Sequence, residues 1–176
     1  NPGDEVLLIQ MQGSGAGTYE FQRIAAVDTG QTLLTLQADI GAFYRVGGTD
    51  RAQVIRVPNW RNLTVPSGAT LTVHSWDRNA GSGGVLVFRA SGTVSVQSGG
   101  GISAAAAGFG GGVAGTVSPR WFNGGSGESY TGPGTQAAGE GSRTPPNAGA
   151  GGGGRGASAG SPGGGGGAGY GYPGQK

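Results

Sequence analysis

The sequence predicts an all-β protein with a short, parallel β-helix-like (solenoid) body, an N-terminal hairpin and an ordered glycine-rich bundle of polyglycine II type. Three observations lead to this fold class: strand-length apolar runs without helical spacing, an internal repeat of 31 residues, and the placement of 30 of the 43 glycines within residues 99–176. We therefore divide the chain into an N-terminal strand and hairpin cap (1–52), a repeat (53–108) and a glycine-rich region (109–176).

The N-terminal segment predicts one strand and one hairpin. Residues 5–12 form a short apolar run closed by a glycine-rich turn, which is typical of a buried strand. Residues 19–27 and 32–37 are rich in β-formers, and the Asp-Thr-Gly-Gln sequence at 28–31 between them indicates a hairpin. Residues 38–52 contain three glycines and no clear pattern, so we expect a loop there.

The repeat becomes visible when the sequence is shifted by 31 positions. Each unit then has three short strands, with a corner that contains Ser-Gly between the last two. A fixed period of this length is typical of solenoids, and three strands per unit favour a parallel β-helix. Leu63 and Val65 are expected to point inward and Thr64 outward. The alternative is a β-sandwich whose strands are alike by chance. The aligned segments are 54–57 with 85–88, 63–65 with 94–96, and 71–73 with 102–104.

An open β-helix exposes its end strands, which pair with other chains unless they are covered. We expect the N-terminal strands to cap one end of the repeat. The other end leads directly into the glycine-rich region.

The glycine-rich region predicts either a flexible linker or a packed bundle. Gly/Ser-rich sequence usually forms linkers. Glycine chains can also adopt an extended left-handed helix with three residues per turn, and several such helices can satisfy each other's backbone groups because no side chain separates them. We expect this second arrangement, held by structural glycines at Gly151, Gly152, Gly153, Gly154, Gly163, Gly164, Gly165, Gly166 and Gly167.

Charge and composition disfavour several classes of function. Seven arginines balance seven acidic residues in 1–98, and the net charge of +2 comes from the C-terminal half. A small, unclustered excess does not predict nucleic-acid binding. The chain has no cysteine and no apolar run long enough to span a membrane. We expect no cofactor, no metal site and no catalytic residues.

The only histidine, His74, lies beside Ser75 and close to Asp77. Neighbouring residues of a strand point to opposite faces, so these three do not predict a catalytic triad. The Asp-x-Asn-x-Gly sequence at 77–81 lacks the remaining acidic ligands of a calcium loop. The Gly-x-Gly-x-x-Gly sequence at 110–115 has no following helix and is expected by chance in so glycine-rich a chain.

Aromatic side chains provide the candidates for ligand contact. Trp60 and Trp76 are expected to pack over corners of the repeat, although a sugar-binding patch is the alternative. The candidate aromatic contact residues of the glycine-rich region are Trp121, Phe122, Tyr130, Tyr170 and Tyr172.

Several stretches resemble large, secreted, glycine-rich bacterial surface proteins. They are GDEVLLIQMQG at 3–13, GTYEF at 17–21, VIRVP at 54–58, LTVPSGATLT at 63–72 and GGVLVFRASGTV at 83–94. The glycine-rich region is also similar in kind to the tip adhesins of phage tail fibres, in which polyglycine helices pack together. Neither family supplies catalytic residues. Relatives of the first family tend to continue beyond the GYPGQK sequence at 171–176, so we expect a fragment or a subunit that its neighbour completes.

These observations predict an extracellular structural protein that assembles with copies of itself into a fibre or surface layer. The alternative is an adhesin that recognises a cell-surface glycan or protein. We expect neither an enzyme nor a nucleic-acid-binding protein.

Overall fold

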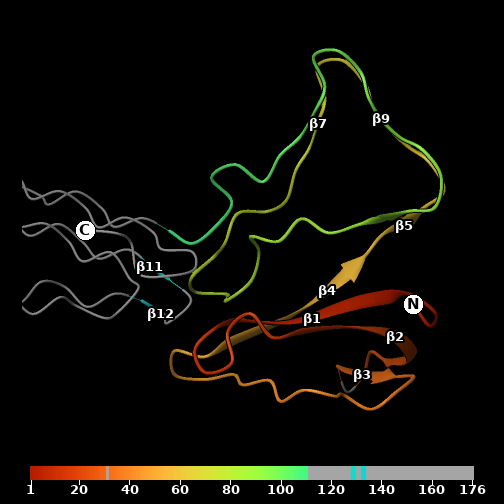
Figure 1. Cartoon of the computed structure of the whole chain (residues 1–176). Helices are drawn as coiled ribbons and strands as arrows, with labels where there is room; N and C mark the ends of the chain where they lie inside the picture. The colour runs from red at the N-terminus through yellow and green to blue at the C-terminus, as the bar shows by residue number, and fades with distance from the viewer. Residues whose placement is uncertain (31, 111–127, 130–131, 134–176) are drawn as a thin grey trace, which may run out of the picture. The chain divides into compact units, whose positions relative to one another are not determined.

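The computed structural model describes residues 1–30, 32–110, 128–129 and 132–133 (Figure 1). Within these residues the chain forms twelve β-strands and no helix, so the all-β prediction is confirmed for the described part. Of the predicted polyglycine bundle (109–176), the structure describes 109–110, 128–129 and 132–133, of which the last two pairs form short antiparallel strands, and all nine structural glycines named above lie outside the described residues.

A four-stranded sheet with the order β3-β2-β1-β4 forms the N-terminal part (Figure 1). It confirms the predicted strand and hairpin, because β1 pairs antiparallel with β2 and β2 pairs antiparallel with β3. The predicted loop ends two residues early, since β4 already begins at Arg51. The strand bounds are Glu5–Gln12 for β1, Tyr19–Asp28 for β2, Leu33–Leu36 for β3 and Arg51–Val57 for β4.

The hydrophobic core of this sheet consists of Val6, Leu8 and Ile24, with Leu36 and Tyr44 packed against it. Seven of the eight β1 residues are buried, as a continuous apolar run predicts for a strand covered on both faces. The edge strand β3 is mostly exposed, which suits its short length.

Glu20 on β2 holds the following loop in place. Its carboxylate accepts hydrogen bonds from the backbone N–H groups of Gly41 at 3.0 Å and Ala42 at 3.4 Å. These bonds, led by the one from Gly41, lower the pKa of Glu20. Burial, together with the neighbouring Glu20 charge, raises the pKa of Tyr44 to about 12. The Glu20 carboxylate therefore holds the loop in which Tyr44 packs against the core. The hydrophobic periodicity of the sequence does not identify Glu20 as the residue that does this.

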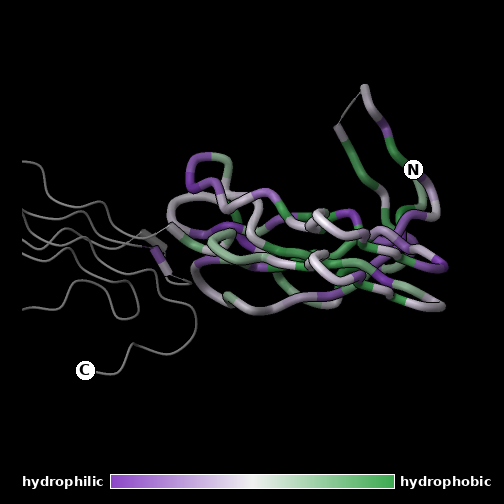
Figure 2. Tube along the Cα trace, turned by 90° about the horizontal axis from the view of Figure 1, so that it is seen from above, coloured by the Kyte–Doolittle hydropathy of each residue, from purple (hydrophilic) through white to green (hydrophobic). Residues whose placement is uncertain are grey.

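Six short strands form the repeat and pair in parallel across it. β5 pairs with β8, β6 with β9, and β7 with β10. Leu63 is opposite Val94 and Thr70 is opposite Gly101, so both pairs are 31 positions apart, as in the sequence repeat. Figures 1 and 2 show these two passes of the chain running side by side. The bounds are Asn59–Trp60 (β5), Leu63–Val65 (β6), Thr70–Leu71 (β7), Arg89–Ala90 (β8), Val94–Val96 (β9) and Gly101–Ile102 (β10).

One predicted strand pair of the repeat is replaced by another. Residues 54–57 belong to β4 in the N-terminal sheet, and residues 85–88 form no strand. Pro58 directly follows β4, and the parallel pairing begins beyond it with Asn59 opposite Arg89. β4 pairs within the N-terminal sheet. The first strand of each predicted unit therefore begins later in the sequence than expected, at Asn59 in the first unit and at Arg89 in the second. Three two-stranded ladders do not by themselves make a β-helix, and that architecture stays a prediction.

The chain divides into two compact units. The first combines 1–9, 18–44 and 52–108, and the second combines 10–17, 45–51 and 109–176. In the part of the chain that the structure describes, no helix is long and apolar enough to cross a membrane.

Candidate functional site

The two corners of the repeat lie directly against each other. The Gly68 N–H donates to the carbonyl oxygen of Gly99 at 3.0 Å. A Cβ at Gly100 would lie 2.7 Å from the carbonyl oxygen of Pro66 and 2.9 Å from that of Val65. Only a residue without a side chain allows this approach.

The side-chain amides of Gln53 and Asn62 hydrogen-bond to backbone groups about 30 positions later in the chain. The Gln53 side chain donates to the carbonyl oxygen of Gly83 and accepts from the Gly83 N–H, both at 3.0 Å. The Asn62 side-chain oxygen accepts from the Thr93 N–H at 2.9 Å. These contacts satisfy backbone groups that short strands leave without a ladder partner.

An ion pair connects the repeat to β1 within the first unit. Arg89 Nε lies 2.7 Å from the carboxylate of Glu5, and its guanidinium stacks over the Phe21 ring at 4.5 Å. The hydrogen bond from Arg89 is the main cause of the lowered pKa of Glu5, with a second bond from Asn59. The sequence separates Glu5 and Arg89 by 84 positions, and no local pattern predicts this contact.

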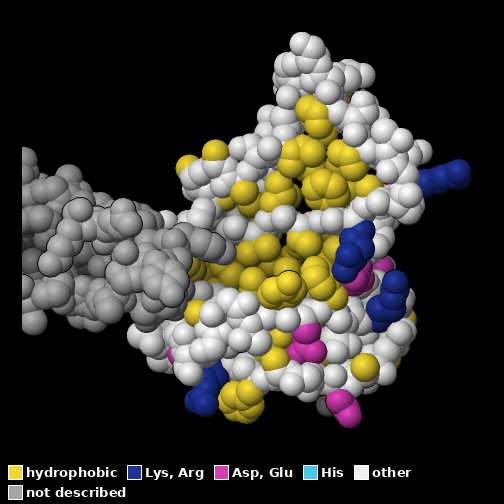
Figure 3. All heavy atoms as spheres, in the orientation of Figure 1, with side chains coloured by type: hydrophobic (Ala, Val, Ile, Leu, Met, Phe, Trp, Pro, Cys, Tyr) yellow, Lys and Arg dark blue, Asp and Glu magenta, His cyan; other side chains and the backbone are white. Residues whose placement is uncertain are grey.

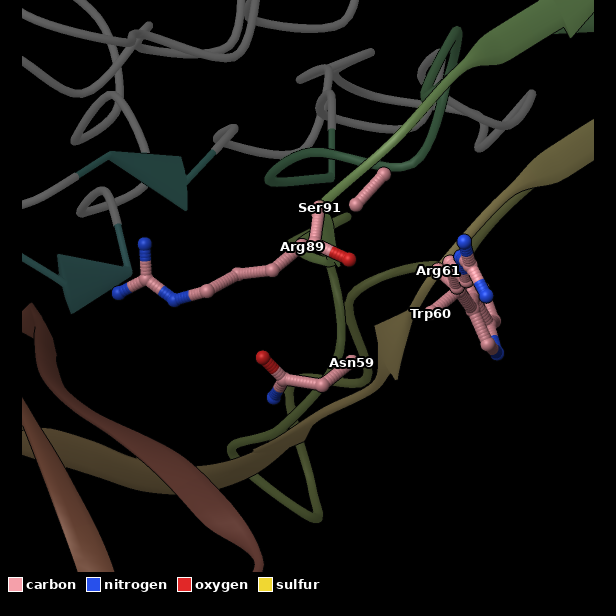
Figure 4. A pocket seen from close by; sticks show the side chains of 6 residues that line it. Asn59, Trp60, Arg61, Arg89 and Ser91 are labelled. Carbon is pink, nitrogen blue, oxygen red and sulfur yellow. The ribbon is translucent and has the colours of Figure 1, made fainter.

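A pocket of about 330 Å³ lies along β5 and β8. In Figure 4 the side chains of Asn59 and Arg89 point to one side of these strands, and those of Trp60 and Arg61 point to the other. The Trp60 ring packs against Phe88 with ring centroids 5.5 Å apart. Ala90 and Ser91 complete the lining.

The apolar residues of β9 and β10 are more exposed than their partners on β6 and β7. Val65 on β6 is 3% exposed, whereas its partner Val96 on β9 is 45% exposed. Val94 and Ile102 are exposed at 42% and 39%. We call Val94, Val96 and Ile102, with the outer edges of β9 and β10, the repeat end. Figure 3 shows hydrophobic side chains gathered among the strands of the repeat on the face turned to the viewer.

The outer edge of β9 carries backbone groups that face away from β6. The Gln97 N–H donates to Val65, and the Thr93 carbonyl oxygen accepts from Leu63, so these two residues face β6. Alternate residues of a strand direct their backbone groups to opposite edges, and Val94 and Val96 therefore direct theirs outward. Among the described strands, β9 pairs with β6 alone.

The segment that carries this edge has no charged residue. The sequence contains no Asp, Glu, Lys or Arg between residues 90 and 110. Proteins usually block an exposed edge strand with charged side chains, proline or a bulge. The repeat end has a flat apolar row and none of these devices within 94–96 and 101–102.

A second cluster of buried polar groups lies in the other unit. The Gln10 side chain is fully buried, donates to the carbonyl oxygens of Gln12, Arg45 and Arg51, and accepts from the Arg45 N–H. Gln12 donates to the carbonyl oxygen of Ser129 at 2.9 Å. The strand that begins in the N-terminal sheet thus holds a segment of the glycine-rich region, β11 (Glu128–Ser129), which pairs with β12 (Gly132–Pro133).

The sequence predicted neither a catalytic triad at His74 nor a calcium loop at 77–81, and in the structure both segments make local hydrogen bonds. His74 is exposed, and its Nδ1 lies 2.8 Å from the backbone oxygen of Ser75. The Asp77 carboxylate accepts from the N–H groups of Asn79 and Ala80 and so caps its own turn, and the Ala80 bond is the first cause of its lowered pKa. The described residues contain no cluster of three or more potential metal ligands from His, Cys, Asp and Glu.

The aromatic candidates divide into two groups. Trp76 is 8% exposed and its backbone N–H donates to Ala107, while Trp60 packs on Phe88, so both lie within the repeat. The candidate contact residues of the glycine-rich region all lie outside the described residues: Trp121, Phe122, Tyr130, Tyr170 and Tyr172.

Comparison of the chain with protein-family models, curated proteins and solved structures gave no match.

Proposed function

We propose that the protein is an extracellular structural protein that assembles with copies of itself into a fibre or surface layer. The observation that carries this proposal is the repeat end, an uncharged strand edge with three exposed apolar side chains. Exposed edges of this kind form templates for pairing with further chains. The extracellular location rests on the resemblance to secreted glycine-rich surface proteins.

The repeat is part of the same proposal. We interpret it as two coils of a short parallel β-helix, with the second coil at an open end. Support comes from the three parallel ladders and from the 31-residue register of β6 with β9 and of β7 with β10. The alternation of half-buried Leu63, exposed Thr64 and buried Val65 agrees with an inward-facing apolar row.

The glycine-rich region supplies a second mode of assembly in this proposal. Its composition suits polyglycine II packing, in which backbones hydrogen-bond to one another without intervening side chains. The partners come from the same chain, from neighbouring chains or from both.

Sedimentation velocity over a concentration series, followed by negative-stain microscopy of the same samples, tests the proposed function. Assembly predicts a sedimentation coefficient that rises with concentration and particles larger than one chain. A single monomeric boundary at every concentration, with no larger particles, contradicts it.

The pocket along β5 and β8 favours one alternative, an adhesin that recognises a glycan. On one side of these strands it combines the Trp60 ring with the guanidinium of Arg61. Sugars bind through aromatic stacking combined with a few oriented polar groups. A glycan array probed with the native protein and with Trp60→Ala and Trp121→Ala variants tests this alternative. Binding that either variant loses supports it, and the absence of any bound glycan contradicts it.

A further inference from the structure

We infer that the repeat end binds the repeat end of a second copy, so that two β9 strands pair edge to edge across a two-fold axis. This inference rests on the proposed self-assembly and names the surface through which its first step occurs. Pairing of one strand edge with the same edge of another copy is antiparallel by symmetry.

The two passes of the repeat differ in the burial of their apolar side chains. Val65 on β6 is 3% exposed, and Leu63 on β6 and Leu71 on β7 are half-buried. The first pass is therefore covered within the chain, whereas Val94, Val96 and Ile102 are exposed at 42%, 45% and 39% on the second. Only the second pass offers an apolar row to a partner.

The chemistry of that partner must match an uncharged segment. The segment 90–110 has no charged residue, so a charged partner would lose hydration without gaining an ion pair there. The matching surface is uncharged, apolar and lined by an unpaired strand edge. The repeat end of a second copy has each of these properties, and like surfaces meet without repulsion because neither carries charge.

Strands of this sequence also fit one another. Val94-Ser95-Val96 already pairs in full register with Leu63-Thr64-Val65, which has the same apolar-polar-apolar pattern. A second β9 strand carries that pattern as well. Its outward N–H and C=O groups at Val94 and Val96 can pair with those of the facing strand, and the apolar rows of the two copies then cover one another.

An isologous contact of this kind closes on itself and produces a dimer. The dimer is then the unit from which a fibre or layer grows. Growth needs a different second contact, for which the glycine-rich region is our candidate.

Single-cysteine cross-linking tests this inference because the native chain contains no cysteine. Ser95→Cys places one thiol at the centre of β9, at a residue that is exposed. In an antiparallel pair about this residue, the two Cα atoms are about 4.5–5.5 Å apart, which allows a disulfide. Thr64→Cys is the matched control, since Thr64 is exposed and is the register partner of Ser95 on β6.

The expected result is a covalent dimer of Ser95→Cys under mild oxidation at high protein concentration, and no such dimer of Thr64→Cys. Equal cross-linking of both variants, or none of either, overturns the two-fold contact. Labelling with a thiol reagent in dilute solution provides a further readout. A thiol at position 95 that is protected in the monomer shows that the chain's own residues cover the edge, and this also overturns the inference.

A charge variant separates this inference from the proposed function. Val96→Lys should convert the dimer to monomer without changing the circular dichroism spectrum, because the lysine would face the partner's apolar row. Leu34→Lys, at a site 41% exposed on β3, is the matched control and should leave the dimer intact. If the native protein assembles and Val96→Lys assembles equally well, the repeat end is not the contact and the proposed function stands. If the native protein stays monomeric, the proposed function fails as well.

Discussion

Gly100 lies so close to Pro66 that a Cβ on Gly100 would stand 2.7 Å from the Pro66 carbonyl oxygen. This close approach between the two corners joins the two passes of the repeat. It also provides the sharpest test of how the repeat is held together, because Gly100 does not have a positive φ and an alanine would cause no backbone strain of its own.

Gly100→Ala should destabilise the repeat by about 1–3 kcal/mol, since the methyl group has only backbone atoms to displace. Thermal unfolding followed by circular dichroism measures the effect. Gly108→Ala is the matched control, because a Cβ there meets nothing within 4 Å and its φ is likewise not positive. Equal melting temperatures for the two variants would mean that the corners do not touch.

Removing the charge of Glu5 should destabilise the first unit. Glu5→Gln loses the ion pair with Arg89, whose Nε is 2.7 Å away, and leaves the guanidinium over Phe21 without its carboxylate. Glu5→Asp keeps the negative charge on a shorter side chain and should lose less stability. Thermal unfolding at neutral pH measures both changes, and a Glu5→Gln variant as stable as the native protein would show that the pair contributes nothing.

The same pair gives a dependence of stability on acid pH. The pKa of Glu5 is lower in the folded protein than its ordinary value, chiefly because Arg89 donates to it. Its contribution is therefore complete above the ordinary glutamate pKa and is lost as the pH falls through the lowered, folded pKa. The native protein should lose more stability than Glu5→Gln between neutral and acid pH. Parallel losses in the two proteins would contradict this assignment.

Tyr44 should make folding sensitive to alkaline pH. Burial and the Glu20 carboxylate raise its pKa to about 12, whereas an unperturbed tyrosine titrates near about 10. A raised folded pKa means that the contribution is complete below about pH 10 and is lost as the pH rises toward about 12. Melting temperatures of the native protein and of Tyr44→Phe over this range test it. The native protein should lose more stability, and equal slopes would count against a half-buried, neutral Tyr44.

Substitution within the glycine-rich region should weaken assembly. Gly153→Val and Gly165→Val each add a branched side chain where the proposed packing brings backbones together. Both variants should shift the concentration dependence of sedimentation toward smaller species. Unchanged assembly in both would contradict polyglycine packing.

The sequence predicted those parts of the fold that depend on local pattern. The apolar run became β1, the turn at 28–31 separates β2 from β3, and the 31-residue shift gave the register of β6 with β9. The same shift wrongly placed residues 54–57 over 85–88. Sequence periodicity shows which residues are alike but does not show which strands pair. Residues 54–57 belong to β4, which pairs with β1 in the N-terminal sheet.

The contacts that the sequence missed join distant residues through polar side chains. Gln10 hydrogen-bonds to backbone groups about Arg45 and Arg51, and Gln12 reaches Ser129, which is 117 positions away. Glutamines within an apolar run are the one available signal, because a buried amide must find partners. That signal indicates that contacts exist but does not identify the partners. The sequence predicted that one end of the repeat is open but not which side chains are exposed there. The structure identifies them, because Val96 is far more exposed than its partner Val65.

Sedimentation velocity of the native protein over a wide concentration range, with negative-stain images of the same samples, is the direct test of self-assembly. We expect a monomer–dimer equilibrium that leads to larger, repeating particles at high concentration. A monodisperse monomer at every concentration, without fibres or layers in the images, would contradict it.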